Sequence, residues 1–210
     1  MSAARWDFAA PLATPRAAQV MLLAFGRGAP ATVAATDGVT VRPLRRADDP
    51  GWFDGWRAGS IRAVAQGDLG DALSHLDASD HVQVIVAEAA AARDLGHLQG
   101  AWAAARRCFA AGATVALDVH ALAWRTATTA PDPAGPLDLD REIRVVFEGE
   151  GGRPDTASPL HTRGLRKFGA PDLIALCTPG DAALVGEMTR QLAHALAHGL
   201  DLADRKSTRL

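Results

Sequence analysis

The order of apolar and polar residues between positions 81 and 119 predicts a strand, a helix and a second strand. In residues 81–86 (HVQVIV) the valines occupy alternate positions, which places them on one face of a strand. From Leu95 to Phe109, apolar residues recur at spacings of three and four, as on one side of an amphipathic helix. Residues 114–119 (TVALDV) return to β-type residues. This succession predicts a right-handed β-α-β crossover between parallel strands.

Short apolar or alternating segments indicate further strands near Val20, Val39, Ile143 and Leu173. Because strands and helices of this kind bury one face each, they are expected to pack in layers around one core. The sequence therefore predicts a single α+β domain over residues 1–204. We expect a mixed β-sheet with the two long helices packed mainly on one face.

The second long helix is expected from Asp181 to His198. Its apolar residues are expected to face the core: Leu184, Val185, Met188, Leu192 and Leu196. A short helix is expected after Asp49-Pro50, because Asp is a preferred N-cap and Pro suits the first helical position. Residues 205–210 (RKSTRL) resemble a peptide that arises when sequencing-adapter DNA is translated, and we expect this tail to be non-native or disordered.

Composition and charge narrow the functional classes. The formal net charge is -2 and the sequence pI is about 6.4, so no global positive field favours nucleic acid or an anionic membrane. The apolar run from Val20 to Phe25 is too short to span a bilayer. The two cysteines, Cys108 and Cys177, form no C-x-x-C pair and are expected to be buried free thiols in a reducing compartment. We expect a cytoplasmic protein.

Two groups of polar residues are candidates for a site. Asp118 and His120 lie two apart at the end of a predicted strand, where ligand sites of open α/β sheets gather and where a carboxylate can orient an imidazole. A second group concentrates donors and positive charge just before a strand: His161, Thr162, Arg163 and Lys167. Such residues can bind an anion or a ligand carboxylate, or they can tie the loop to the sheet. Structural roles remain open for both groups.

The segment from His161 to Leu173 (HTRGLRKFGAPDL) resembles a signature of uncharacterised bacterial domain-of-unknown-function families. In these families an H-T-x-G-L-type loop and a G-x-P-[DE] turn precede a strand. The resemblance covers less than a tenth of the chain. It implies a bacterial origin and an α+β fold, and it assigns no activity and no catalytic residue.

Three other patterns have both a functional and a structural interpretation. His194 and His198 are four apart on a helix, as zinc ligands can be, but a solvated polar stripe explains them and no metal is expected. Trp52 and Trp56 can form a stacking platform or part of the core. Gly26-Arg27-Gly28 lacks the third glycine and the helix of a phosphate loop, so a plain turn is favoured.

No G-x-S-x-G elbow, Walker loop or paired C-x-x-C motif is present. The first hypothesis is therefore a non-enzymatic accessory module that recognises a protein partner and needs no cofactor. The second is a hydrolase- or transferase-like enzyme in which His161, Arg163, Asp118 and His120 converge on an anionic substrate. A third, weaker one is a small-ligand sensor with the Trp52–Trp56 face as its platform. The oligomeric state is left open.

Overall fold

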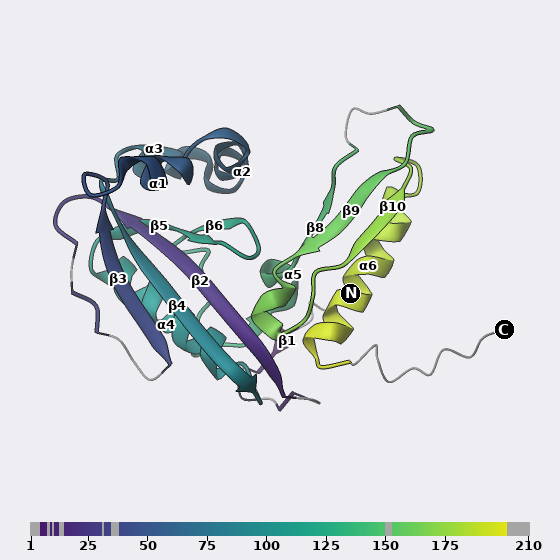
Figure 1. Cartoon of the computed structure of the whole chain (residues 1–210), viewed down its shortest axis with the longest axis horizontal. Coiled ribbons are helices and arrows are strands. Elements are labelled where there is room, and N and C mark those ends of the chain that lie inside the picture. Colours follow the sequence, from purple (N-terminus) through teal and green to yellow (C-terminus); the bar gives the residue numbers. More distant parts are fainter. Residues whose placement is uncertain are drawn as a thin grey trace.

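The computed structural model of the chain describes residues 5–7, 9, 11–12, 15–30, 32–34, 38–149 and 153–200. It confirms the predicted α+β class, with helices packed on an antiparallel five-stranded sheet and on a smaller three-stranded sheet (Figure 1). The tail at 205–210 lies outside the described residues.

The larger sheet has its strands in an order that differs from their order in the chain. From one edge to the other these are β3 (Val39–Arg45), β4 (His81–Ala92), β2 (Arg16–Gly26), β5 (Ala113–Asp118) and β6 (Ala123–Thr126). Every neighbouring pair in this sheet is antiparallel. The sheet is therefore not mixed in its pairing, which differs from the expectation.

The predicted crossover is present with one change. Both β4 and β5 are antiparallel to β2, so they run in the same direction, and helix α4 (Gly96–Ala110) connects them. However, β2 lies between them, so the two parallel strands are not direct partners. The composition of β2 accounts for this strand order. Its residues 20–25 (VMLLAF) are almost entirely buried, and a strand at the centre of a sheet has both edges paired and both faces covered.

The two faces of the larger sheet are covered by different helices. On one face α4 contributes Leu98 and Trp102 to a core that contains Leu22 of β2. On the other face Phe25 of β2 and Trp124 of β6 pack under three short helices and a 3-10 turn, which are α1 (Pro50–Gly55), α2 (Gly59–Leu69), η1 (Gly70–Ala72) and α3 (Leu73–Asp77). The sequence did not predict α2, whereas the helix expected after Asp49-Pro50 is α1, and its Asp49 cap is confirmed by the bond to the Trp52 amide (3.0 Å).

The smaller sheet has the order β10 (Ile174–Cys177), β9 (Ser158–Arg163) and β8 (Arg144–Phe147), with both pairings antiparallel. The second long helix, α6 (Ala182–Ala197), packs on this sheet rather than on the larger one (Figure 1). This placement differs from the expectation that both long helices cover one face of a single sheet. One hydrophobic cluster nevertheless extends from α4 to Ala193 and Leu196 of α6.

Helix α6 docks through small residues. Its buried positions are Thr189, Ala193, Leu196 and Ala197, and Gly186 lies against Leu160 of β9. Small side chains allow the helix to approach the sheet closely. In this orientation, three residues that the sequence analysis assigned to the core point outward. These exposed residues are Leu184, Met188 and Leu192.

The remaining elements connect the two sheets. The two-residue strand β1 (Arg5–Trp6) pairs with β7 (Leu137–Asp138), which leads into the short helix α5 (Leu139–Glu142) and then β8. The 3-10 helix η2 (Leu165–Phe168) follows β9 and packs against β2.

Candidate functional site

Asp118 ends strand β5 and organises the turn that follows it. Its Oδ1 atom accepts hydrogen bonds from the backbone N–H groups of His120 and Ala121, both at 3.1 Å. A short carboxylate side chain commonly stabilises a turn in this way. The sequence predicted Asp118 at the end of a strand, and its first role in the structure is to shape the turn.

The other oxygen of Asp118 belongs to a buried cluster of charges. The Nζ atom of Lys167 donates to Asp118 Oδ2 and to Oε2 of Glu142, the last residue of α5. The side chains of Lys167 and Glu142 are 0% exposed and that of Asp118 is 1% exposed. We call these three residues the buried ion cluster. It joins the end of β5, helix α5 and η2, so the charge of Lys167 is enclosed rather than presented to solvent.

Two glycines allow η2 to insert Lys167 into the protein. Gly164 has φ +110°, and a Cβ at this position would overlap the carbonyl oxygen of Glu142. Gly169 has φ +69°, and a Cβ there would lie 2.5 Å from Cβ of Arg16. Both the backbone angles and the close approaches favour glycine. The motif that the sequence presented as a binding loop is therefore built to seat a buried lysine.

The carboxylates hold Lys167 in its charged form. Burial alone would lower the pKa of Lys167, but the negative charges of Asp118 and Glu142 outweigh this effect and raise it. The cluster contains one cation and two carboxylates, and the Oε1 atom of Glu142 has no hydrogen-bond partner among the described residues. Such a cluster depends on every member, because a buried charge without its partner is costly.

Two histidines lie beside the buried ion cluster. His97 of α4 is hydrogen-bonded through Nε2 to the backbone oxygen of Lys167 (2.8 Å), which fixes η2 against α4. His120 is partly buried, and its Nε2 has no hydrogen-bond partner within the described ranges. Burial lowers the pKa of both imidazoles; for His120 the negative charge of Asp118 opposes this effect. Both rings are therefore held in the neutral form more strongly than in an unfolded chain.

The residues His161, Thr162 and Arg163 diverge because they lie in strand β9 and not in a loop. Successive side chains of a strand point to opposite faces. Thr162 points inward, where its hydroxyl donates to Asp172 (3.1 Å) and accepts from the backbone N–H of Leu173 (2.7 Å). His161 points outward, and its Nε2 lies 3.1 Å from Oε1 of Glu148. The structure thus joins Asp118 with Lys167, and it leaves His161 and Arg163 on a different surface.

Sequence reasoning missed Glu142 and Asp172, which complete the contacts of Lys167 and Thr162. Glu142 gave no signal, since a carboxylate in a short helix is normally exposed. Asp172 lies in the G-x-P-D part of the recognised segment, and it also accepts from the Leu165 N–H (3.1 Å). If residues 158–163 are interpreted as a strand, whose side chains alternate between two faces, His161 and Arg163 fall on the face opposite Thr162.

The face of the smaller sheet opposite α6 carries two strongly exposed apolar side chains. Directly paired residues of an antiparallel ladder share a face, and Leu160 marks the face that α6 covers. The opposite face, which we call the open face, consists of Arg144, Val146, Pro159, His161, Arg163, Ile174 and Leu176. Ile174 and Leu176 are 74% and 72% exposed. Large apolar side chains this exposed on adjacent positions typically mark an interaction surface.

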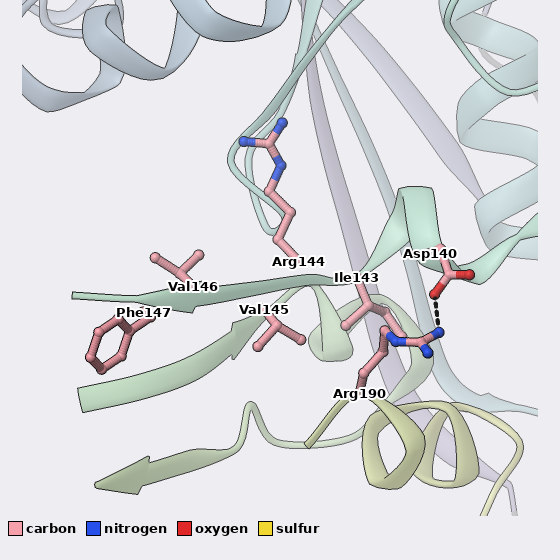
Figure 2. A pocket seen from close by; sticks show the side chains of 7 residues that line it. All are labelled: Asp140, Ile143, Arg144, Val145, Val146, Phe147 and Arg190. Atoms are coloured by element: carbon pink, nitrogen blue, oxygen red, sulfur yellow. Dashed lines mark hydrogen bonds and ion pairs between the residues drawn. The ribbon is translucent and has the colours of Figure 1, made fainter. Parts of the chain in front are cut away.

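A groove follows the edge of the same sheet. It has a volume of about 710 Å³ and is lined by Asp140, Ile143, Arg144, Val145, Val146, Phe147 and Arg190. Figure 2 shows Arg144 and Val146 on one side of β8 and Val145 and Phe147 on the other. Arg190 forms an ion pair with Asp140 (2.9 Å) at the end of this groove. Because side chains from both faces line one groove, the groove runs along the free edge of β8.

The other sequence candidates have structural partners. The backbone N–H of Gly28 donates to both carboxylate oxygens of Asp80 (2.9 and 3.1 Å), so an acidic side chain takes the place that a phosphate would have. Trp52 and Trp56 pack edge to face, with ring centroids 5.7 Å apart, and both rest on the core under α1–α3. These contacts agree with a turn and with core packing.

His194 lies beside an acidic residue. Its Nε2 is 3.2 Å from Oδ1 of Asp140, an oxygen that Arg190 also binds. Across the described part of the chain, no three His, Cys, Asp or Glu side chains gather in a way that could hold a metal ion.

Comparison with protein-family models, with curated proteins and with solved structures finds no match for this chain. Within the described residues, no helix has both the length and the apolar character that crossing a bilayer requires.

Proposed function

We propose that this chain is a non-enzymatic binding module that recognises a protein partner through its three-stranded sheet. The observation that carries this proposal is the exposure of Ile174 and Leu176, side by side on the open face. A partner that covered both side chains would remove them from water, which contributes roughly 25 cal/mol for each Å² of apolar surface buried.

The open face also supplies polar groups suited to a protein interface. His161 and Arg163 lie beside the apolar residues, and arginine is one of the residues that contribute most to binding at interfaces. A basic-apolar patch on a chain of net charge -2 favours a protein over a nucleic acid as the partner. We propose the bacterial cytoplasm as the setting, since Cys108 and Cys177 are both free and buried.

The geometry gives the enzyme hypothesis little support. That hypothesis requires His161, Arg163, Asp118 and His120 to converge in one pocket. Asp118 is enclosed with Lys167 in the buried ion cluster, whereas His161 and Arg163 are on the open face. An imidazole acting as a general base needs the proton it abstracts within hydrogen-bond reach, and none of these four residues lines the groove beside β8.

Site-specific photo-crosslinking in the cells that produce the protein tests this proposal. A photoreactive residue is introduced at Ile174 or Leu176, and at Thr40 as a matched exposed position on an edge strand of the other sheet. We expect adducts of one defined mass at the first two positions and none at Thr40. A second change, Leu176→Ser in the Ile174 photo-variant, is expected to reduce the adduct severalfold.

Equal crosslinking at all three positions would mean non-specific contact and would overturn the proposal. So would the absence of adducts at Ile174 and Leu176 while the protein is folded. Folding is checked by thermal unfolding, because Ile174 and Leu176 are exposed and their replacement by Ser is expected to change stability by less than about 0.5 kcal/mol.

A further inference from the structure

Strand β8 has one edge without a partner strand. It stands at the end of the order β10-β9-β8, and among the described residues only β9 pairs with it. The N–H of Glu148 donates to the carbonyl of Pro159 (2.9 Å), which identifies the hydrogen-bonded pairs of this ladder. Since such pairs alternate, Arg144 and Val146 direct their backbone groups toward β9. The N–H and C=O groups of Val145 and Phe147 therefore point to the free edge.

No described residue donates to, or accepts from, these outward backbone groups of Val145 and Phe147. They are accessible, because the groove of about 710 Å³ follows this edge (Figure 2). Backbone donors and acceptors repeated at every second residue along a groove match one kind of occupant, which is another extended chain.

The charges beside the edge indicate the composition of that chain. Arg144 of β8 is directly paired with Arg163 of β9, so both arginines lie on the open face. Arg144 is bound by Asp68 of α2 (2.5 Å), whereas Arg163 makes no ion pair with any described residue. Asp68 thus already supplies a carboxylate to Arg144, and the charge of Arg163 is the one left without a carboxylate among the described residues. An acidic side chain from the occupant would complement Arg163.

We propose that β8 accepts an extended, acidic and apolar segment of a protein partner as a fourth strand of the smaller sheet. The backbone of the segment bonds to Val145 and Phe147, its apolar side chains continue the row of Val146 on the open face, and a carboxylate lies near Arg163. This inference rests on the proposed function and specifies its mode of binding. The partner is recognised by shape and charge as an added strand.

The test uses a displayed library of random 12-residue peptides, selected on the full chain and resynthesised for measurement of Kd by fluorescence anisotropy. We expect enriched peptides that alternate apolar residues and contain at least one Asp or Glu. Val145→Pro removes an outward N–H without removing a bond to β9, and we expect it to raise Kd at least about tenfold. Val145→Thr, which retains the N–H and the β-branched shape, is the matched control and is expected to bind within about twofold of the parent chain.

Two further measurements separate strand addition from other modes. N-methylation of successive peptide residues is expected to abolish binding at every second position only, because alternate N–H groups face β8. Arg163→Gln is expected to weaken acidic peptides severalfold and to reduce the salt dependence of Kd.

Each alternative outcome overturns the inference in a distinct way. Binding that is insensitive to Val145→Pro but lost in Ile174→Ser/Leu176→Ser would leave the proposed function standing and exclude strand addition. A dimer of the chain that dissociates in Val145→Pro would identify a second copy as the occupant instead. A selection that returns no enriched peptide would also contradict strand addition. The proposed function is tested separately, by crosslinking at Ile174.

Discussion

Lys167 and Asp118 form an ion pair in which neither side chain is exposed to water, although 49 residues separate them in the chain. Glu142 binds the same ammonium group, so three segments that are distant in sequence meet at one nitrogen. Burial of these charges is unfavourable by itself, and the cluster is stable only because the groups are paired. The position of η2, and with it the entry to β10, therefore depends on this contact.

Removal of the cation is expected to destabilise the protein strongly. Lys167→Met keeps the volume of the side chain but leaves Asp118 and Glu142 without their partner. We expect the free energy of unfolding, measured by urea denaturation, to fall by about 3–5 kcal/mol. If this variant does not fold, the triple variant Lys167→Met/Asp118→Asn/Glu142→Gln provides the comparison, because it removes all three charges and is expected to be more stable than Lys167→Met alone.

The control for this prediction is an exposed ion pair of similar geometry. Arg62 binds Asp77 with both terminal nitrogens at 2.5 and 3.0 Å, and the two side chains are 40% and 48% exposed. Arg62→Ala is expected to cost less than about 1 kcal/mol. A result in which Lys167→Met costs no more than Arg62→Ala would contradict the enclosure of the cluster.

The close approach at Gly164 gives a second prediction. Gly164→Ala places a methyl group against the Glu142 carbonyl in a backbone conformation that disfavours alanine. We expect a loss of about 1–3 kcal/mol in the free energy of unfolding. Gly67→Ala is the matched control: Gly67 is exposed in α2 with open space around it, so this change is expected to stabilise the protein by up to about 1 kcal/mol. Equal effects of the two changes would mean that η2 does not contact α5.

Local periodicity predicted the elements better than their arrangement. The predicted helix from Leu95 to Phe109 corresponds to α4 (Gly96–Ala110), and the predicted strand at residues 81–86 is the beginning of β4. Patterns of this kind depend on residues a few positions apart. The insertion of β2 between β4 and β5 depends instead on contacts between distant segments. No local pattern distinguishes that order from direct pairing of β4 with β5.

The candidate site was predictable only in part, for a similar reason. Asp118 and Lys167 were both identified from the sequence, but as members of two separate groups. Lysine is rarely buried unless it is paired, and the sequence does not show that Asp118 and Glu142 supply the partners. The exposure of Ile174 was also unexpected, because apolar residues of a strand are normally assigned to the core. An uncovered apolar strand can be recognised only once the layers are known.

The thiol of Cys108 gives a third prediction. Burial raises the pKa of Cys108 to about 11, because the thiolate is poorly solvated between α4 and the sheet. At pH 8 the reactive thiolate is then only about a thousandth of the total. We expect iodoacetamide to modify Cys108 in the native protein at least about a hundredfold more slowly than in the urea-unfolded chain. Mass spectrometry distinguishes this site from Cys177, and rapid native labelling of Cys108 would contradict the packing of α4.

Four histidines provide a prediction for the pH dependence of stability. Burial lowers the pKa of each imidazole in the folded state, and they are His97, His120, His194 and His198. Below the unfolded pKa of about 6.5, the unfolded chain takes up protons that the folded protein does not bind. Stability is therefore fully present above pH 6.5 and decreases as the pH falls toward 5. Each histidine adds at most about 1.4 kcal/mol to the decrease per pH unit.

His97 allows this dependence to be assigned to one group. Its contact with the Lys167 carbonyl requires Nε2–H, and the amide of His97→Gln can donate to the same oxygen without titrating. The free energy of unfolding is measured by urea denaturation between pH 7 and pH 5. We expect its slope against pH to be smaller in His97→Gln than in the parent chain, whatever the stability of the variant at pH 7. His75→Gln, at an exposed position of α3, is the matched control and should keep the slope of the parent chain. This pH range lies above the titration of ordinary carboxylates, so the slope reports mainly histidines. A slope that is unchanged in His97→Gln, or a stability that increases as the pH falls from 7 to 5, would show that His97 is not held neutral beside the buried ion cluster.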